Sequence, residues 1–176
     1  MPFDSPGTIA DHGACDRIRD HRIRQRPIRC RDSHRERGER LARVGLGRHL
    51  LFYDPERNRP ENQRLPFVTL VIHDYPGWDT ASQLDRDGIF RVNIAIGRSG
   101  FERLLGYPPA QHEAHHDEFD YALTDVLISH PMYASQGWVS IVNPAAQTSM
   151  QLHQLLEEAH ALAVRRHARR QDAHQT

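Results

Sequence analysis

The run His112–His116 reads HEAHH and contains the pattern H-E-x-x-H. On a helix this spacing places two His side chains one turn apart as zinc ligands, with the Glu as the general base of a metallopeptidase. Such a helix needs an apolar face, but here the motif follows two prolines and its neighbours are almost all polar. The chain holds 13 His, so the pattern readily arises by chance. We therefore expect a loop and no resident metal, the metal-ligand candidates being His112, His115 and His116.

A second set of chemically capable residues lies in the block HPMYASQGWVSIVNP, residues 130–144. His130 could carry a proton, because the usual pKa of a His ring lies near neutrality, but no nucleophile at a regular spacing accompanies it. One interpretation is structural, with Tyr133 and Trp138 as packing anchors and Asn143 as a turn residue. The other is a ligand-facing surface, whose candidates are Arg91, Asn93, His130, Tyr133, Gln136, Trp138 and Asn143.

The segment Gly97–Gly100 has the pattern G-x-x-G between an expected strand and an expected helix. This resembles a phosphate loop, but it lacks the full glycine pattern and the Lys of a P-loop. The sequence therefore predicts no phosphate site here, and we expect no cofactor.

Four runs rich in apolar and β-branched residues predict the strands that must position these side chains: 50–53, 67–74, 90–97 and 138–142. In the third run, period-two alternation places Val92 and Ile94 on one face and Arg91 and Asn93 on the other. We expect the first face in the core and the second in contact with water.

Three helices are expected. The first covers 99–105, with Ser99 and Glu102 at capping-box spacing and Gly106 as its stop signal, and the second covers 119–128. The third is amphipathic, begins near Thr148 with Gln151 at capping-box spacing, and should pack on the sheet; the arginines near its end complement the helix dipole. The fold class is therefore α+β: a small antiparallel sheet packed against a long C-terminal amphipathic helix and one or two short helices.

The 23 basic and 23 acidic residues are unevenly distributed. Residues 1–49 carry 12 Arg and 7 acidic residues, whereas the remaining chain carries 11 Arg and 16 acidic residues. The excess of acidic residues after residue 49 argues against nucleic-acid binding by the domain, because such binding needs a basic face. Two cysteines without metal or disulfide spacing fit a cytoplasmic location, and no apolar run is long enough to span a membrane.

The blocks RVNIAIGRSGFERLLG, HPMYASQGWVSIVNP and LLEEAHALA resemble the bacterial domain-of-unknown-function family 6194 over roughly residues 50–165. This resemblance implies an architecture but no activity. The order of the elements is also similar to the YjbR (MmcQ-like) family, with its α+β fold of frataxin type, and that similarity would allow nucleic-acid binding.

Residues 1–49 show neither helical nor strand periodicity, and two explanations stay open. The segment is a disordered Arg-rich extension, or it is a frameshifted reading, since one back-translation of residues 45–50, shifted by one nucleotide, encodes a Trp-Gly-Asp segment expected in the family. We assign residues 50–170 to a single domain and 171–176 to a tail.

The function that these observations favour is a non-catalytic binding or interaction module for a small molecule or a protein. One alternative is a small-molecule enzyme that uses His130 or the His112–His116 cluster. Another is a nucleic-acid-binding module of YjbR-like type.

Overall fold

The computed structural model describes residues 39–44, 48–57, 59–60 and 64–174, and of residues 39–44 it describes the backbone. The strands are β1 (Glu39–Val44), β2 (Arg48–Tyr53), β3 (Pro66–Val71), β4 (Arg91–Ala95), β5 (Leu127–Ser129) and β6 (Trp138–Val142). The α-helices are α1 (Gly97–Leu105), α2 (His112–His115) and α3 (Ser149–His174), and the 3-10 helices are η3 (Pro109–Gln111), η4 (His116–Glu118) and η5 (Ala134–Gln136).

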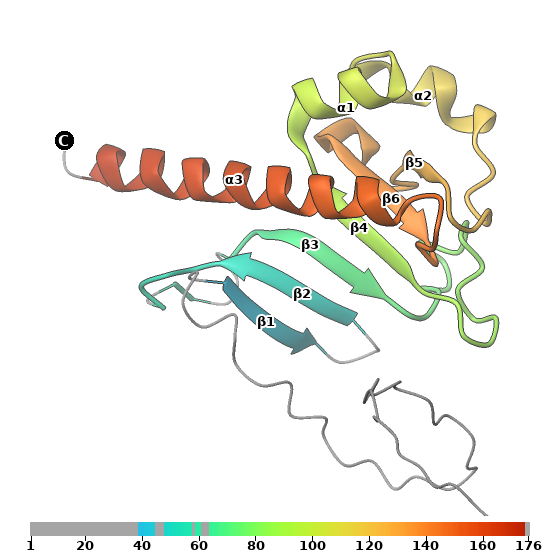
Figure 1. The fold of residues 1–176 in the computed structure, drawn as a ribbon, viewed down its shortest axis with the longest axis horizontal. Helices are drawn as coiled ribbons and strands as arrows, with labels where there is room; N and C mark the ends of the chain where they lie inside the picture. The colour runs from blue at the N-terminus through green and yellow to red at the C-terminus, as the bar shows by residue number, and fades with distance from the viewer. Residues whose placement is uncertain (1–38, 45–47, 58, 61–63, 175–176) are drawn as a thin grey trace, which may run out of the picture. The chain divides into compact units, whose positions relative to one another are not determined.

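The strands form one sheet in the order β1-β2-β3-β4-β6-β5, with every neighbouring pair antiparallel (Figure 1). Each of the four predicted strands is part of it. The α+β class predicted from the sequence is therefore confirmed, together with the packing of a long C-terminal helix on the sheet.

The sheet begins before the domain boundary expected at residue 50. Strand β1 pairs with β2 along its whole length, from Glu39 opposite Tyr53 to Val44 opposite Arg48. An edge strand can be held by backbone hydrogen bonds alone, so it needs no apolar alternation that the sequence would reveal. Helix α3 also includes residues 171–174, which were expected as tail. Residues 1–38 lie outside the described residues, so their interpretation stays a prediction.

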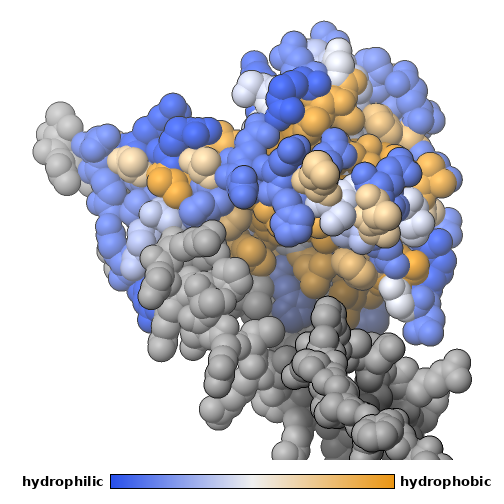
Figure 2. All heavy atoms as spheres, viewed as in Figure 1, coloured by the Kyte–Doolittle hydropathy of each residue, from blue (hydrophilic) through white to orange (hydrophobic). Residues whose placement is uncertain are grey.

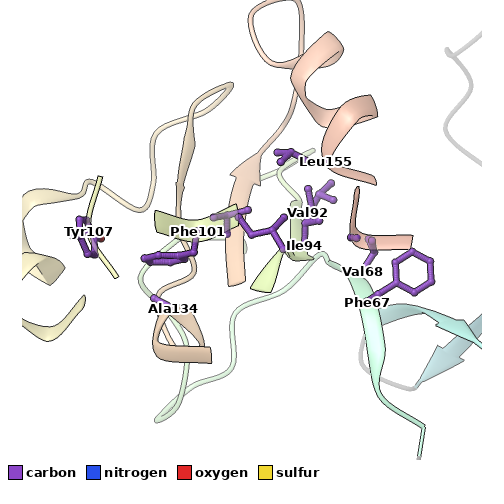
Figure 3. Packing of buried hydrophobic residues seen from close by; sticks show 11 residues of the cluster. Phe67, Val68, Val92, Ile94, Phe101, Tyr107, Ala134 and Leu155 are labelled. Carbon is purple, nitrogen blue, oxygen red and sulfur yellow. The ribbon is translucent and has the colours of Figure 1, made fainter. Parts of the chain in front are cut away.

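Helix α3 lies across one face of the sheet and buries its apolar stripe there (Figure 1). Figure 3 shows Leu155 of α3 facing Val92 and Ile94 of β4, and the Leu155 side chain is buried. Complete burial of one such side chain stabilises a fold by about 1.5–3 kcal/mol. On the face seen in Figure 2, the C-terminal part of α3 is mostly hydrophilic, which is consistent with a solvated helix end.

The other face of β4 is also buried, which corrects the expectation that it contacts water. Arg91 and Asn93 are each 1% exposed. Their face is partly covered by the connection between β3 and β4, where Leu84 packs with Val71 and Val142 in a second small core. Strand periodicity identifies the two faces of a strand, but it cannot show that a distant loop covers the polar one.

Helix α1 begins at Gly97, earlier than predicted, and no side chain in the described part of the chain caps its first turn. The predicted capping box of Ser99 and Glu102 is therefore wrong. The backbone N–H groups of Ile96 and Gly97 instead donate to the carbonyl of Gly137, each at 3.1 Å. The stop at Gly106 is confirmed: its φ is 83° and its N–H donates to the Glu102 carbonyl at 2.8 Å.

The helix predicted over 119–128 is wrong. The chain turns at Asp125, whose φ is 57° and whose N–H donates to the Val142 carbonyl at 2.7 Å, and then pairs with β6 as strand β5. The Asp125 carboxylate also replaces the predicted capping box before α3. It accepts hydrogen bonds from the backbone N–H groups of Ala145, Gln147 and Thr148 and from the Thr148 hydroxyl.

None of the helices among the described residues is both long and apolar enough to cross a membrane.

Candidate functional site

A cleft of about 730 Å³ opens on the sheet face that carries Arg91 and Asn93, and we call it the sheet cleft. Strands β2, β3, β4 and β6 contribute to it, together with residues 75–79 and 130–136. Its volume lies within the range of about 300–1,000 Å³ that is usual for small-molecule sites. The cleft brings together six of the seven ligand-facing candidates: Arg91, Asn93, His130, Tyr133, Gln136 and Trp138.

The seventh candidate, Asn143, is a turn residue and does not line the sheet cleft. Its φ is 43°, in the left-handed region that Asn tolerates better than most residues. Its side-chain oxygen accepts from the Phe90 N–H at 2.7 Å, and its amide nitrogen donates to the Gly88 carbonyl at 3.1 Å. Asn143 therefore holds the entry to β4 against the end of β6.

Thr69 and Asn93 lie on the floor of the sheet cleft, and with the buried Ser140 beside them they form a row of three polar side chains. Thr69 pairs with Asn93, and Asn93 pairs with Ser140, on three adjacent strands. The Asn93 amide nitrogen donates to the Thr69 hydroxyl at 2.9 Å, and the Ser140 hydroxyl donates to the Asn93 oxygen at 2.9 Å. Because both ends of the Asn93 amide are engaged, its orientation is fixed before any ligand binds.

Arg91 and Asp79 form a buried, bidentate ion pair beside this row. Both terminal nitrogens of Arg91 donate to the Asp79 carboxylate, and one also donates to the Ser82 hydroxyl at 2.7 Å. A planar guanidinium matches a carboxylate in this way, and the pair leaves little net charge. Arg91 is therefore a neutralised part of the floor.

His130 is 3% exposed, and its protonation is set by the backbone. Its Nδ1 accepts hydrogen bonds from the N–H groups of Met132 and Tyr133, at 3.0 and 3.2 Å. Nε2 therefore carries the ring proton. Burial, with Arg91 as a smaller cause, holds the pKa of His130 well below its usual value of 6.5. The suggestion that His130 carries a proton near neutrality is thus corrected: the ring is a neutral donor.

The aromatic wall comes from a tight turn. The Trp78 N–H donates to the Tyr75 carbonyl at 2.9 Å across Pro76-Gly77, and Gly77 has φ 76°. Pro followed by Gly with positive φ is the signature of a type II turn. The turn places Tyr75 and Trp78 at the sheet cleft, and Trp78 remains 62% exposed. Trp138 lines the cleft from β6, so both tryptophans of the chain lie there.

Sequence reasoning missed Arg48, Tyr75 and Trp78. Arg48 lies on β2, and its Nε donates to the Tyr75 hydroxyl at 3.0 Å while its guanidinium lies 4.9 Å from the centre of the Tyr75 ring. The Tyr-Pro-Gly-Trp turn was the available signal for the two aromatic residues. Nothing local distinguishes Arg48 from the other arginines of residues 1–49.

The HEAHH run forms the short helix α2 and the first residue of η4, not the expected loop, and of its five residues His112 is buried. The His112 ring is buried, with Nδ1 at 3.1 Å from the Tyr107 hydroxyl and Nε2 at 3.3 Å from the Tyr121 hydroxyl. His115 stacks on the Tyr107 ring, with ring centres 3.9 Å apart, and His116 contacts the Tyr121 hydroxyl at 3.2 Å. Among the described residues, no group of three or more His, Cys, Asp or Glu side chains is placed to hold a metal ion.

Comparison with curated proteins and with solved structures found no match in either. The similarity to the YjbR family stays a prediction. The model of a family of unknown function, DUF6194, matches residues 28–172. This range includes all the strands that the structure describes and all the residues that line the sheet cleft. The chain therefore belongs to the DUF6194 family.

Proposed function

We propose that this domain is a non-catalytic binding module whose ligand is a small molecule held in the sheet cleft. The observation that carries the proposal is that one cleft of about 730 Å³ brings together candidates from two segments distant in the sequence, Arg91 and Asn93 on β4 and the four candidates between His130 and Trp138. The floor is polar and held by internal hydrogen bonds, and the walls are largely aromatic and apolar. A mainly apolar pocket with a few placed polar groups is the usual design of a small-molecule site.

The groups that could do chemistry are engaged in ways that favour binding. His130 is held as a neutral donor, and Arg91 is paired with Asp79. A general acid or base works best with a pKa near the working pH, and the lowered pKa of His130 lies away from it. These contacts support recognition and give no support to the alternative of an enzyme that uses His130.

The two tryptophans provide a site-specific test. In a ¹H–¹⁵N spectrum their two indole N–H signals both report on the sheet cleft, because the chain has no other tryptophan. We expect members of a mixed library of small molecules to shift both signals and to be recovered unchanged after incubation. Chemical conversion of a bound compound would contradict the non-catalytic part of the proposal.

A matched pair of variants separates binding in the cleft from binding elsewhere. Gln136 and Gln111 are both exposed and both end a 3-10 helix, but only Gln136 lines the sheet cleft. Gln136→Phe should fill part of the cleft and abolish the shifts, whereas Gln111→Phe should leave them intact. If no compound shifts either indole signal of the folded protein, the proposal is wrong.

A further inference from the structure

Among the described residues that line the sheet cleft, one cation has no carboxylate partner. The Arg91 guanidinium is neutralised by Asp79, and both side chains are buried. Arg48 also lines the cleft, and in the described part of the chain no carboxylate pairs with it. Since Asp79 is the cleft's one acidic lining residue among those described, Arg48 is left as its net positive charge.

Arg48 and His130 provide free hydrogen-bond donors among the residues that line the sheet cleft. Arg48 uses Nε on the Tyr75 hydroxyl, and within the described residues neither of its terminal nitrogens has a partner. His130, which also lines the cleft, uses Nδ1 as an acceptor, so its Nε2–H is a donor. The Asn93 oxygen is already occupied by Ser140. A donor-rich cleft is complementary to a ligand rich in acceptors.

The aromatic side chains that line the sheet cleft favour a flat ligand. Tyr75, Trp78, Tyr133 and Trp138 surround the polar floor, and Trp78 and Tyr133 remain 62% and 38% exposed. Exposed aromatic rings that gather at a cleft provide faces on which a flat ring can stack. The His130 ring also meets Tyr133 edge to face, with ring centres 4.9 Å apart, which holds this part of the wall in place.

We infer that the sheet cleft binds flat aromatic monoanions, specifically carboxylates, whose charged group pairs with Arg48 and whose ring lies between the tryptophans. The inference rests on the proposed function and names its ligand class. A guanidinium binds a carboxylate through two parallel hydrogen bonds, and the two terminal nitrogens of Arg48 can provide them. A monoanion balances the charge of Arg48, the one cation left without a carboxylate partner among the described lining residues, whereas a dianion would carry one negative charge in excess.

Four probes with the same two-ring skeleton test each part of this inference: 2-naphthoate, the neutral 2-naphthamide, the dianion 2-naphthyl phosphate and the non-aromatic decalin-2-carboxylate. The indole signals of Trp78 and Trp138 report binding. We expect 2-naphthoate to bind with a Kd on the order of 1 mM, as suits a ligand of this size. The amide should bind about tenfold more weakly, because it lacks the charge-assisted hydrogen bonds. The phosphate and the decalin acid should also bind more weakly than 2-naphthoate.

Variants of Arg48 test whether its guanidinium pairs with the carboxylate of the ligand. Arg48→Gln should weaken 2-naphthoate about tenfold and leave 2-naphthamide unchanged, which also shows that the variant is folded. Arg48→Lys should keep part of the preference for the acid. Arg98→Gln removes an equal charge from an exposed position on α1, outside the cleft, and should change neither affinity.

The results distinguish this inference from the function on which it rests. Equal affinities for the acid and the amide, tighter binding of the phosphate or the decalin acid, or equal loss of both naphthalene ligands in Arg48→Gln would overturn the ligand class. In each case the indole shifts would still support a small-molecule site. If none of the four probes shifts either signal, the ligand class is also wrong, and the library experiment alone decides the proposed function.

Discussion

The guanidinium of Arg91 and the carboxylate of Asp79 form a bidentate ion pair beneath the sheet cleft, with only 1% and 7% of the two residues exposed. The two residues come from β4 and from the connection that folds over it. The pair therefore joins the floor of the cleft to its aromatic turn. Among the described residues that line the cleft, it also leaves Arg48 as the one charged side chain without a carboxylate partner.

Removal of one partner of this ion pair should destabilise the folded protein. Asp79→Asn leaves the Arg91 charge buried without a counter-charge, and such a change typically lowers the free energy of unfolding by about 3–5 kcal/mol. Urea unfolding measures it. Asp87→Asn, an exposed acid on the same connection, should change the free energy by less than about 0.5 kcal/mol. The double variant Arg91→Met with Asp79→Leu should recover much of the loss; equal stability of Asp79→Asn and the wild type would contradict the role of the pair.

The protein should lose stability as the pH falls below neutrality. Burial lowers the pKa of His130 and of His112 in the folded state, whereas in the unfolded chain both lie near 6.5. Below about pH 6.5 the unfolded chain takes up protons that the folded state does not, so their contribution is complete above this pH and declines below it. Protonation of the unfolded chain at His130 alone lowers the free energy of unfolding by up to about 1.4 kcal/mol per pH unit, and His112 adds a smaller contribution of the same sign.

Urea unfolding between about pH 7 and pH 5 tests this slope, and His130→Asn is the informative variant. The Asn oxygen can replace Nδ1 as acceptor for the Met132 and Tyr133 N–H groups, but it does not titrate. The slope should therefore become shallower in His130→Asn. A long-range ¹H–¹⁵N spectrum of the wild type near pH 6 should show His130 as the neutral Nε2–H tautomer; a charged ring at this pH would contradict the assignment.

Asp125 should stabilise the approach to α3 only while it is ionised. Hydrogen bonds, led by the one from the Thr148 hydroxyl, lower the pKa of the Asp125 carboxyl to about 2. Its contribution should be present above the unfolded-state pKa and lost as the pH falls through about 2. Asp125→Ala should therefore lower the melting temperature at neutral pH, and the difference from the wild type should narrow in acid. Asp117→Ala, which removes an exposed acid of η4, is the control.

Gly137 should be intolerant of a side chain. Its φ is 78°, and an added Cβ would lie 2.6 Å from the backbone carbon of Gly97. Gly106 is a matched control, since it also ends a helix with positive φ, but its Cβ would meet nothing within 4 Å. Gly106→Ala should cost about 1–2 kcal/mol for its backbone conformation. Gly137→Ala should cost about 1–3 kcal/mol more through overpacking. If chemical unfolding shows that Gly137→Ala and Gly106→Ala lower the free energy of unfolding equally, the close approach of Gly137 to Gly97 does not affect stability.

Local patterns in the chain were enough to predict much of the fold and part of the site. The β-branched runs over 67–74, 90–97 and 138–142 predicted strands, because the alternation that buries one face is visible within a few residues. The candidates between His130 and Trp138 were found together since they are close in sequence. The helix predicted over 119–128 failed because pairing with β6 outweighs a local preference, as tertiary contacts often do.

What the sequence by itself determined was the strands' periodicity, the apolar stripe of α3 and the membership of the family, all of which depend on residues near one another in the chain. Only the tertiary structure decided that Asp79 neutralises Arg91, that backbone N–H groups set the tautomer of His130, and that Arg48, which pairs with no carboxylate of the described residues, lines the same cleft as the two tryptophans. These relationships join segments that are brought together by folding. Charge and protonation depend on burial and on partners in space, and neither is encoded in local spacing.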